Sequence, residues 1–170
     1  MPNQYSQEPD YSKPVSDDFD ALSRDLVPVR SLIEDDLQQI IRIDRRITNR
    51  DRSAYLQRKA AQVLRESGVR ISLVAEGDER LVGFIMAKVD YGEFGHTDTV
   101  AVIDTIGVDP SEQSHNVGRA LVSQLLRNLS SLRVETVRTE VLWQDFGLNR
   151  FLAQCGFSPA QRLAFSLNID

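Results

Sequence analysis

One segment of the chain limits the possible folds more than any other. Residues 99–108 have the sequence TVAVIDTIGV, in which apolar side chains occupy both odd and even positions. Side chains alternate between the two faces of a strand, so this pattern predicts a strand that is buried on both faces. Such a strand lies inside a sheet that is covered by helices on both sides. A four-residue apolar repeat then predicts a helix shortly after it, at Val117, Leu121, Leu125 and Leu129.

The other elements are predicted from apolar periodicity and from residues typical of caps and turns. Ser31 with Glu34 three positions later is a capping-box signature, and Gly77-Asp78 is a hairpin signal. We expect strands at 26–30, 71–76, 80–89, 99–108, 134–142 and 162–168, and helices at about 31–47, 52–66, 117–129 and 146–154. The order βααβββαβαβ indicates an α/β fold with a mixed central sheet and helices on both faces.

Length and composition indicate one globular domain with a separate N-terminal tail. The chain has 170 residues, of which 41% are apolar and 26% are charged. Residues 1–25 contain six acids and two bases without an apolar period, so we expect a disordered acidic tail there and a folded domain at 26–170. The tail accounts for most of the net charge of -5, which leaves the folded part near neutral. Nucleic acid is therefore not an expected partner.

Cysteine, histidine and hydropathy patterns exclude several further classes. The longest uninterrupted apolar run has four residues, whereas a membrane span needs about 20, so we expect neither a membrane span nor a secretion signal. A single cysteine, Cys155, cannot form an internal disulfide, and the two histidines, His96 and His115, are too few for a metal-ligand cluster. These features fit a cytoplasmic protein without a metal. No histidine is near Cys155 in the sequence, so we expect a small packed core residue there and not an acyl-accepting nucleophile.

Two segments resemble motifs of a known family. Residues 106–121 have the sequence IGVDPSEQSHNVGRAL, which resembles the acyl-CoA-binding motif of the GNAT superfamily of N-acetyltransferases, a V-x-P strand end followed by Q/R-x-x-G-x-G/A. Gln113, Asn116 and Gly118 occupy its defining positions, and asparagine, which tolerates positive φ, stands where the family has glycine. Residues 139–141 and 151–157 (FLAQCGF) resemble the family's L-E-V strand and its closing L-Y-x-x-x-G-F helix.

The resemblance implies a GNAT fold over residues 26–170 and an enzyme that transfers an acetyl group from acetyl-CoA to a primary amine. The backbone of Ile106, Gly107 and Val108 would contact the acyl carbonyl and pantetheine. The pyrophosphate would be held at the helix start, where unpaired N–H groups and the helix dipole favour anions. That part of the expected site comprises Gln113, Ser114, His115, Asn116, Val117, Gly118 and Arg119.

Acetyl transfer requires a neutral amine, so a base is expected, and two carboxylates are candidates. Asp104 interrupts the apolar strand at 99–108, although a structural pair with an arginine or a backbone cap would also explain a buried carboxylate. Glu140 lies in the L-E-V-like segment, twelve residues before Leu152, which in ribosomal-protein N-terminal acetyltransferases of this superfamily is the spacing between base and acidic tyrosine. A solvated strand residue is the alternative for Glu140.

Two departures from the family pattern favour a second hypothesis. Leu152 stands where the family usually has a tyrosine that protonates the departing thiolate, and leucine cannot donate a proton. Tyr91 or water would have to replace it, or the thiolate leaves without help. Asp145 stands where asparagine is common. The alternative is therefore a non-catalytic acyl-CoA-binding regulatory module. A structural protein with an empty loop is a third and more remote reading.

The acceptor amine is not specified by the motifs. Protein lysine, a protein N-terminus, polyamines and small amines all fit, so a protein partner and the oligomeric state are both open. Residues 91–98 mix aromatic and ionisable side chains and form either a rim of the acceptor site or a plain hairpin connection. Residues 42–70 contain nine bases and three acids, which fits a solvated helix face or the binding of an acidic acceptor or partner.

Overall fold

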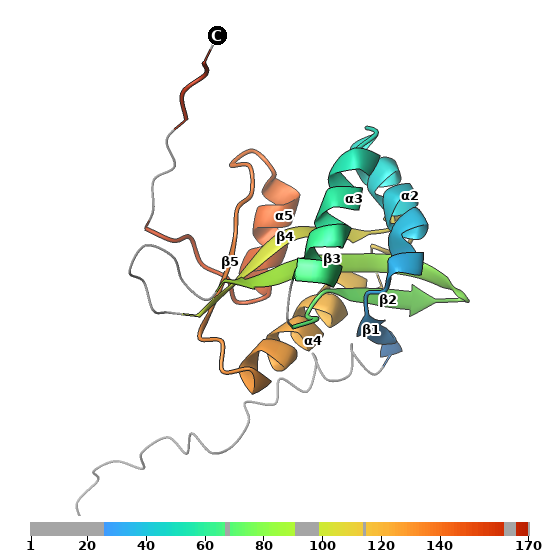
Figure 1. Ribbon diagram of the computed structural model, residues 1–170, viewed down its shortest axis with the longest axis horizontal. Coiled ribbons are helices and arrows are strands. Elements are labelled where there is room, and N and C mark those ends of the chain that lie inside the picture. Colours follow the sequence, from blue (N-terminus) through green and yellow to red (C-terminus); the bar gives the residue numbers. More distant parts are fainter. Residues whose placement is uncertain (1–25, 67–68, 91–98, 114, 162–165, 170) are drawn as a thin grey trace, which may run out of the picture.

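A single mixed sheet organises the protein (Figure 1). The computed structural model describes residues 26–66, 69–90, 99–113, 115–161 and 166–169. In these residues five strands pair in the order β1-β2-β3-β4-β5. Neighbouring strands are antiparallel except for β4 and β5, which are parallel. The strands are β1 (Val29–Ser31), β2 (Leu73–Gly77), β3 (Arg80–Asp90), β4 (Val100–Val108) and β5 (Thr136–Thr139).

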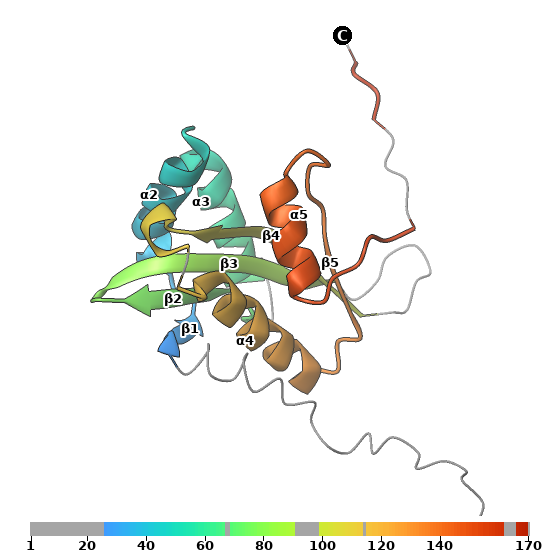
Figure 2. The ribbon, with the colours of Figure 1, turned by 180° about the vertical axis from the view of Figure 1, so that it is seen from behind.

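Helices cover both faces of the sheet, as the sequence predicted. The helices α2 (Leu37–Thr48) and α3 (Ser53–Ala61) lie on one face, and α4 (Val117–Ser131) and α5 (Phe146–Gln154) lie on the other (Figures 1 and 2). Short turns precede α2 and α4 or extend α3, namely η1 (Glu34–Asp36), η3 (Pro110–Glu112) and the π-turn η2 (Gln62–Glu66). The α/β fold class and the mixed sheet are confirmed.

Each face of the sheet has its own core. On the face of α2 and α3, Phe84 and Met86 pack with residues such as Ile40 and Leu56. On the face of α4, Ile85 and Ile103 pack with several apolar side chains of that helix, namely Val117, Ala120, Leu121, Val122, Leu125 and Leu129. Adjacent residues of β3 therefore point into different cores, and β3 is the middle strand in the order of the sheet. The strand β4 is its internal neighbour rather than the centre itself.

The start of the first helix differs from the prediction. Ser31 lies in β1 and caps no helix. Instead, the Asp36 carboxylate accepts a hydrogen bond from the Ile33 backbone N–H at 2.9 Å and pairs with Arg30 at 2.8 Å. The capping-box prediction for Ser31 and Glu34 is therefore wrong, because an aspartate two residues after Glu34 closes the turn.

The turn between β2 and β3 is one residue later than predicted. Gly77 pairs with Arg80, so the two loop residues are Asp78 and Glu79, with φ of 43° and 62°. A two-residue turn with positive φ at both positions matches the right-handed twist of the strands. Gly77 stays in the ladder, where a Cβ atom would come within 3.1 Å of Val82.

The C-terminal part contains less strand than expected. The strand predicted at 134–142 covers only Thr136–Thr139, which leaves Glu140 outside it. Of the strand predicted at 162–168, residues 162–165 lie outside the described residues, and residues 166–168 are not in a strand. The predicted tail at 1–25 and the loop at 91–98 also lie outside the described residues.

The described residues also bear on membrane insertion and on metal binding. Within them, no helix is both long and apolar enough to cross a membrane. Among the same residues, no three histidine, cysteine, aspartate or glutamate side chains are grouped closely enough to hold a metal ion.

Candidate active site

The strands β4 and β5 separate halfway along β4. Their parallel ladder runs from the pair Val100–Thr136 to the pair Ile103–Thr139, whereas β4 continues to Val108. The Thr139 hydroxyl donates a hydrogen bond to the Ile103 carbonyl oxygen at 3.1 Å and marks the end of the contact. Beyond that point, the edge of β4 that faces β5 has no strand partner among the described residues.

The backbone of two predicted site residues faces this open edge. The Asp109 N–H donates to the Val82 carbonyl oxygen of β3 at 2.8 Å. Backbone groups alternate in direction along an antiparallel strand, so the N–H and C=O groups of Ile106 and Val108 point away from β3. They are directed at the gap left by β5. Two donors and two acceptors are thus available at the positions expected to contact an acyl group and its pantetheine.

Gly107, between these two residues, has a packing role. A Cβ atom at this position would come within 2.6 Å of the Phe84 ring and 3.0 Å of Ile47. The glycine therefore allows the Phe84 ring to approach the backbone of β4 closely in the core under α2. Its predicted place in the site follows from its backbone position and not from a need for flexibility.

Asp104 forms a β-bulge at the point where the strands separate. Met86 pairs with Thr105, and Ala87 pairs with Ile103, so Asp104 is the extra residue on β4. Its Oδ1 atom lies 3.0 Å from the Lys59 ammonium of α3, and its side chain is 13% exposed. Its Oδ2 atom is buried without a hydrogen-bond partner among the described residues. Such an unsatisfied oxygen is rare in proteins, and bulges are common beside active sites.

Glu140 lies at the same level of the sheet, just beyond the end of β5. It follows Thr139 directly, just as Asp104 follows Ile103, and those two residues form the last pair of the ladder. The Glu140 side chain is exposed and has no hydrogen bond or ion pair among the described residues. The fold therefore brings the two candidate bases to one point of the sheet, with Asp104 enclosed and Glu140 open to solvent.

The loop after β4 leads to the start of α4. Asn116 has φ 58° and ψ 16°, the left-handed conformation that its residue type tolerates. The Ala120 N–H donates to the Asn116 carbonyl oxygen at 2.9 Å, so the amides of Val117 and Gly118 precede the first intrahelical bond. Gln113 and His115 are exposed, Arg119 is half-buried, and Ser114 lies outside the described residues. The helix start is a suitable place for an anion.

A close contact between two helices fixes this start. A Cβ atom on Gly118 would lie 3.1 Å from the Phe151 ring of α5. The missing side chain thus allows α4 and α5 to approach each other, a role that the motif alone did not reveal.

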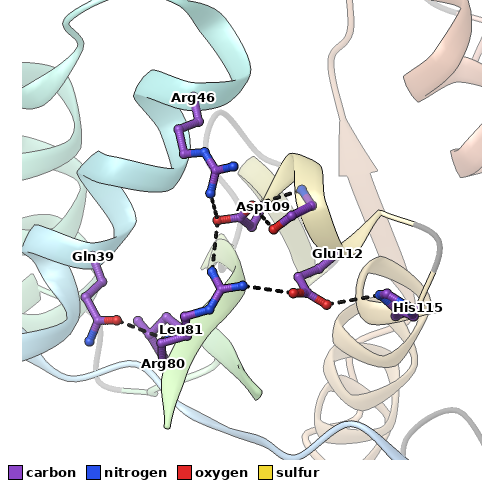
Figure 3. Close-up of polar contacts among 8 residues, drawn as sticks. Gln39, Arg46, Arg80, Leu81, Asp109, Glu112 and His115 are labelled. Atoms are coloured by element: carbon purple, nitrogen blue, oxygen red, sulfur yellow. Dashed lines mark hydrogen bonds and ion pairs between the residues drawn. The ribbon is translucent and has the colours of Figure 1, made fainter. Parts of the chain in front are cut away.

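Sequence reasoning missed a charged network that anchors the loop (Figure 3). Asp109 is buried, and its carboxylate accepts hydrogen bonds from the Ser111 N–H and hydroxyl at 3.0 and 2.7 Å. Arg46 of α2 and Arg80 of β3 bind the same carboxylate at 2.6 and 3.3 Å. Burial alone would raise the pKa of Asp109, but the hydrogen bonds from Ser111 and the charges of the two arginines outweigh it and lower the pKa. Asp109 therefore stays ionised.

The same network compensates the negative charge of Glu112, the second acid of the loop. Glu112 pairs with Arg80 at 2.9 Å and with His115 Nδ1 at 3.0 Å. A carboxylate close to the expected pyrophosphate is therefore paired with a cation, which compensates its negative charge. The Asp-Pro-Ser sequence at 109–111 is a recognisable cap signal, but its partners Arg46 and Arg80 are 63 and 29 residues away and have no local signature.

The two departures from the family pattern have structural roles. Leu152 is 7% exposed and packs in the interior. Asp145 caps α5, where its Oδ1 atom accepts a hydrogen bond from the Leu148 N–H at 3.0 Å. Cys155 is half-buried and packs against the core under α4. Leu152 provides no proton, and the charge of Asp145 is held at a helix start, where the dipole stabilises it.

The fold defined by these features is that of the GNAT N-acetyltransferases. The aminoglycoside acetyltransferase meta-AAC0020 from an uncultured soil metagenomic sample, in complex with sisomicin, superposes with a TM-score of 0.68 at 19% identity over 86% of this chain and 98% of that one. AAC(6')-Iy in complex with the bisubstrate analogue CoA-S-monomethyl-acetylneamine superposes with a TM-score of 0.70 at 14% identity, over 85% of this chain and 99% of that one. A transcriptional regulator from Bacillus halodurans C-125 superposes with a TM-score of 0.71 at 17% identity, over 84% of this chain and 99% of that one.

A family profile identifies the chain itself. The profile described as the acetyltransferase (GNAT) family matches residues 34–157. The protein therefore belongs to the GNAT acetyltransferase family. A comparison with curated protein sequences gave no match.

Proposed function

We propose that the protein is an N-acetyltransferase that transfers the acetyl group of acetyl-CoA to a primary amine. The main supporting observation is the open edge of β4, where the backbone of Ile106 and Val108 faces a gap beside the bulge at Asp104. Membership in the acetyltransferase family supports the same activity. For the compartment we propose the reducing cytoplasm, because the chain has a single cysteine.

The chain has groups suited to each part of acetyl-CoA. The N–H groups of Ile106 and Val108 would bind the acyl carbonyl and the pantetheine, and a donor at the carbonyl polarises it for attack. The amides of Val117 and Gly118 would bind the pyrophosphate, with His115 and Arg119 adding positive charge. The Asp109 network holds this loop against α2 and β3, so that these donors are in place before the ligand arrives.

The reaction needs a base. An alkylamine has a pKa of about 10, so at neutral pH it must lose a proton before its nitrogen can attack. The new C–N bond then replaces the C–S bond, and the sulfur leaves as a thiolate that needs little help from an acid, since thiols have a pKa of about 8.5. Glu140 and Asp104 remain the candidates for the base. Both have a carboxylate oxygen without a hydrogen-bond partner among the described residues.

Steady-state kinetics of two matched variants tests this proposal. If Glu140 accepts the proton, Glu140→Gln keeps acetyl-CoA affinity but lowers kcat/KM by about 10² to 10⁴, and the loss shrinks as pH rises because more amine is already neutral. If Asp104→Asn shows the larger pH-dependent loss instead, the roles are reversed. If Asp104→Asn lowers only the melting temperature, its pair with Lys59 is structural. Changes below about threefold in both variants would contradict carboxylate-base catalysis.

A second candidate function is a non-catalytic acyl-CoA-binding regulator. It is favoured by Leu152, whose buried apolar side chain stands where the family usually has the proton donor. The superposition with a transcriptional regulator is compatible with it but reflects the fold alone. A regulator would bind acetyl-CoA and release no CoA with any amine. A panel of amines and peptides, with CoA release as the readout, separates the two functions.

A further inference from the structure

Two hollows on the described surface differ in charge. One, of about 510 Å³, lies at the β2–β3 hairpin and includes Glu76, Asp78 and Glu79 in its lining. The other, of about 530 Å³, lies along α3 and is lined by Tyr55, Arg58, Lys59, Ala61 and Gln62. Both volumes are in the range of small-molecule sites. The second, here called the α3 hollow, has two cations and no acid among its described lining residues.

An ion pair connects the α3 hollow to the reaction point. Lys59 lines the hollow, and its ammonium contacts Asp104 Oδ1 at 3.0 Å at the bulge of β4. The hollow therefore lies beside the residue where β4 and β5 separate. Among the described residues, no hydrogen bond or ion pair links the hairpin hollow to that point. The α3 hollow is thus the better placed of the two for an acceptor amine.

Arg58 contributes an uncompensated charge. Several cations of α2, α3 and their connection are already paired, including Arg46 with Asp109, Arg52 with Asp44, and Lys59 with Asp104. The Arg58 guanidinium is exposed and has no hydrogen bond or ion pair among the described residues. Because Asp104 and Lys59 neutralise each other, the described lining has a net charge of about +1 from Arg58.

We propose that the acceptor is a small amine that also contains an anionic group, a carboxylate or a phosphate. Arg58 binds this anionic group, and the amine lies toward Asp104, whose pair with Lys59 joins the hollow to the bulge of β4. The guanidinium is suited to the task, since its planar donors match both kinds of anion. The amine is thereby directed at the β4 bulge. The inference rests on the proposed function and narrows its substrate class.

The same charge disfavours polycations. Aminoglycosides such as sisomicin, which is bound in one of the superposed structures, contain several ammonium groups. In the α3 hollow they would meet Arg58 without an acid to offset it among the described lining residues. We therefore expect this chain to differ from those neighbours in its acceptor.

The experiment compares acceptors that differ only in the anionic group. Acetylation of 4-aminobutyrate is measured against 4-aminobutanamide, and O-phosphoethanolamine against ethanolamine, with sisomicin and a peptide with an acidic N-terminal sequence as further arms. We expect kcat/KM for at least one acid to exceed that of its neutral counterpart by about tenfold or more, as a charged hydrogen bond provides. Sisomicin should be the poorer acceptor. Equal rates within both pairs, a preference for sisomicin, or acetylation of the peptide alone would overturn the proposal.

Two arginine variants show whether Arg58 is the cause. Arg58→Gln should reduce the preference for the acid to below about twofold, mainly through a higher KM for the acid. Arg42→Gln, in which another exposed and unpaired arginine is removed from α2 outside the hollow, should keep the preference. A preference that survives Arg58→Gln would contradict the role of Arg58.

Binding measurements separate failure of this inference from failure of the proposed function. The same amines are titrated calorimetrically into the full-length protein in the presence of CoA. Preferential binding of an acid that disappears in Arg58→Gln, without any acetylated product, would support the α3 hollow and contradict catalysis. Equal or undetectable binding of acid and neutral amine would overturn the inference, whatever the activity.

Discussion

At the scale of single residues, Asp109 determines how the loop before α4 is held. Its carboxylate joins three separate parts of the chain, because it binds Ser111 in the loop, Arg46 in α2 and Arg80 in β3. A buried carboxylate without such partners would be costly. Here the partners make the charge favourable, and they connect the loop to both the hairpin and the first long helix.

We expect Asp109→Asn to destabilise the protein by about 2 kcal/mol, because hydrogen bonds to a charged group are lost and two arginines lose their acceptor. Urea denaturation at neutral pH measures the change. Asp35→Asn, which removes an exposed carboxylate without a described contact, is the matched control and should be nearly silent. Equal effects of the two variants would show that the network contributes no stability.

The pH dependence of this difference follows from the lowered pKa of Asp109. A carboxylate with a lowered pKa contributes stability that is complete above its ordinary pKa of 3.8 and is lost as pH falls through the lower value of the folded state. The stability difference between wild type and Asp109→Asn should therefore stay constant from pH 7 to about pH 5 and shrink only below about pH 4. A difference that already disappears near pH 6 would contradict the role of the Asp109 carboxylate.

At the scale of elements, the contact between α4 and α5 depends on the absence of a side chain at Gly118. A Cβ atom there would lie 3.1 Å from Phe151, closer than comfortable packing allows. Alanine normally stabilises a helix relative to glycine by about 1 kcal/mol. The helix preference for alanine and the crowding at position 118 oppose each other, and the crowding comes from the Phe151 ring.

We expect Gly118→Ala to destabilise the wild type by about 1 kcal/mol through overpacking, but to stabilise a Phe151→Ala background by up to about 1 kcal/mol. A double-mutant cycle of urea denaturation curves measures the coupling. The interpretation fails if alanine at position 118 has the same effect in both backgrounds.

Local patterns predicted the elements better than their connections. The β-strand at 100–108 and the helix from Val117 were visible because burial imposes a period on the sequence. The position of the hairpin turn was predicted one residue early, because Gly77 is the more obvious turn residue although it remains in the ladder. The pairs of Lys59 with Asp104 and of Arg46 with Asp109 join residues that are distant in sequence, so no local pattern indicates them.

At the scale of the whole molecule, the described residues from 26 onward contain a five-stranded sheet and a layer of helices on each of its faces. We propose that residues 1–25, which have a net charge of -4 from two bases and six acids, act as a tail that takes no part in acetyl-CoA binding. The family profile begins at residue 34, which is consistent with this division.

A chain that begins at Leu26 should bind acetyl-CoA with a Kd within about twofold of the full-length value, because ligand contacts are expected only from the folded part. Calorimetric titration of both forms measures this, and thermal unfolding shows whether the shortened chain is folded. A large loss of affinity in a folded, shortened chain would mean that the tail packs on the site.

The gap beside β4 also has a consequence for the exchange of backbone amides with solvent. The amides of Ile106 and Val108 point away from β3 into the gap, whereas the amide of Gly107 points toward β3. In the ligand-free protein, the amide hydrogens of Ile106 and Val108 should therefore exchange with deuterium much faster than that of Gly107 between them. Acetyl-CoA should slow the exchange of these two amides and leave Gly107 unchanged, since the ligand takes the place of the absent neighbouring strand.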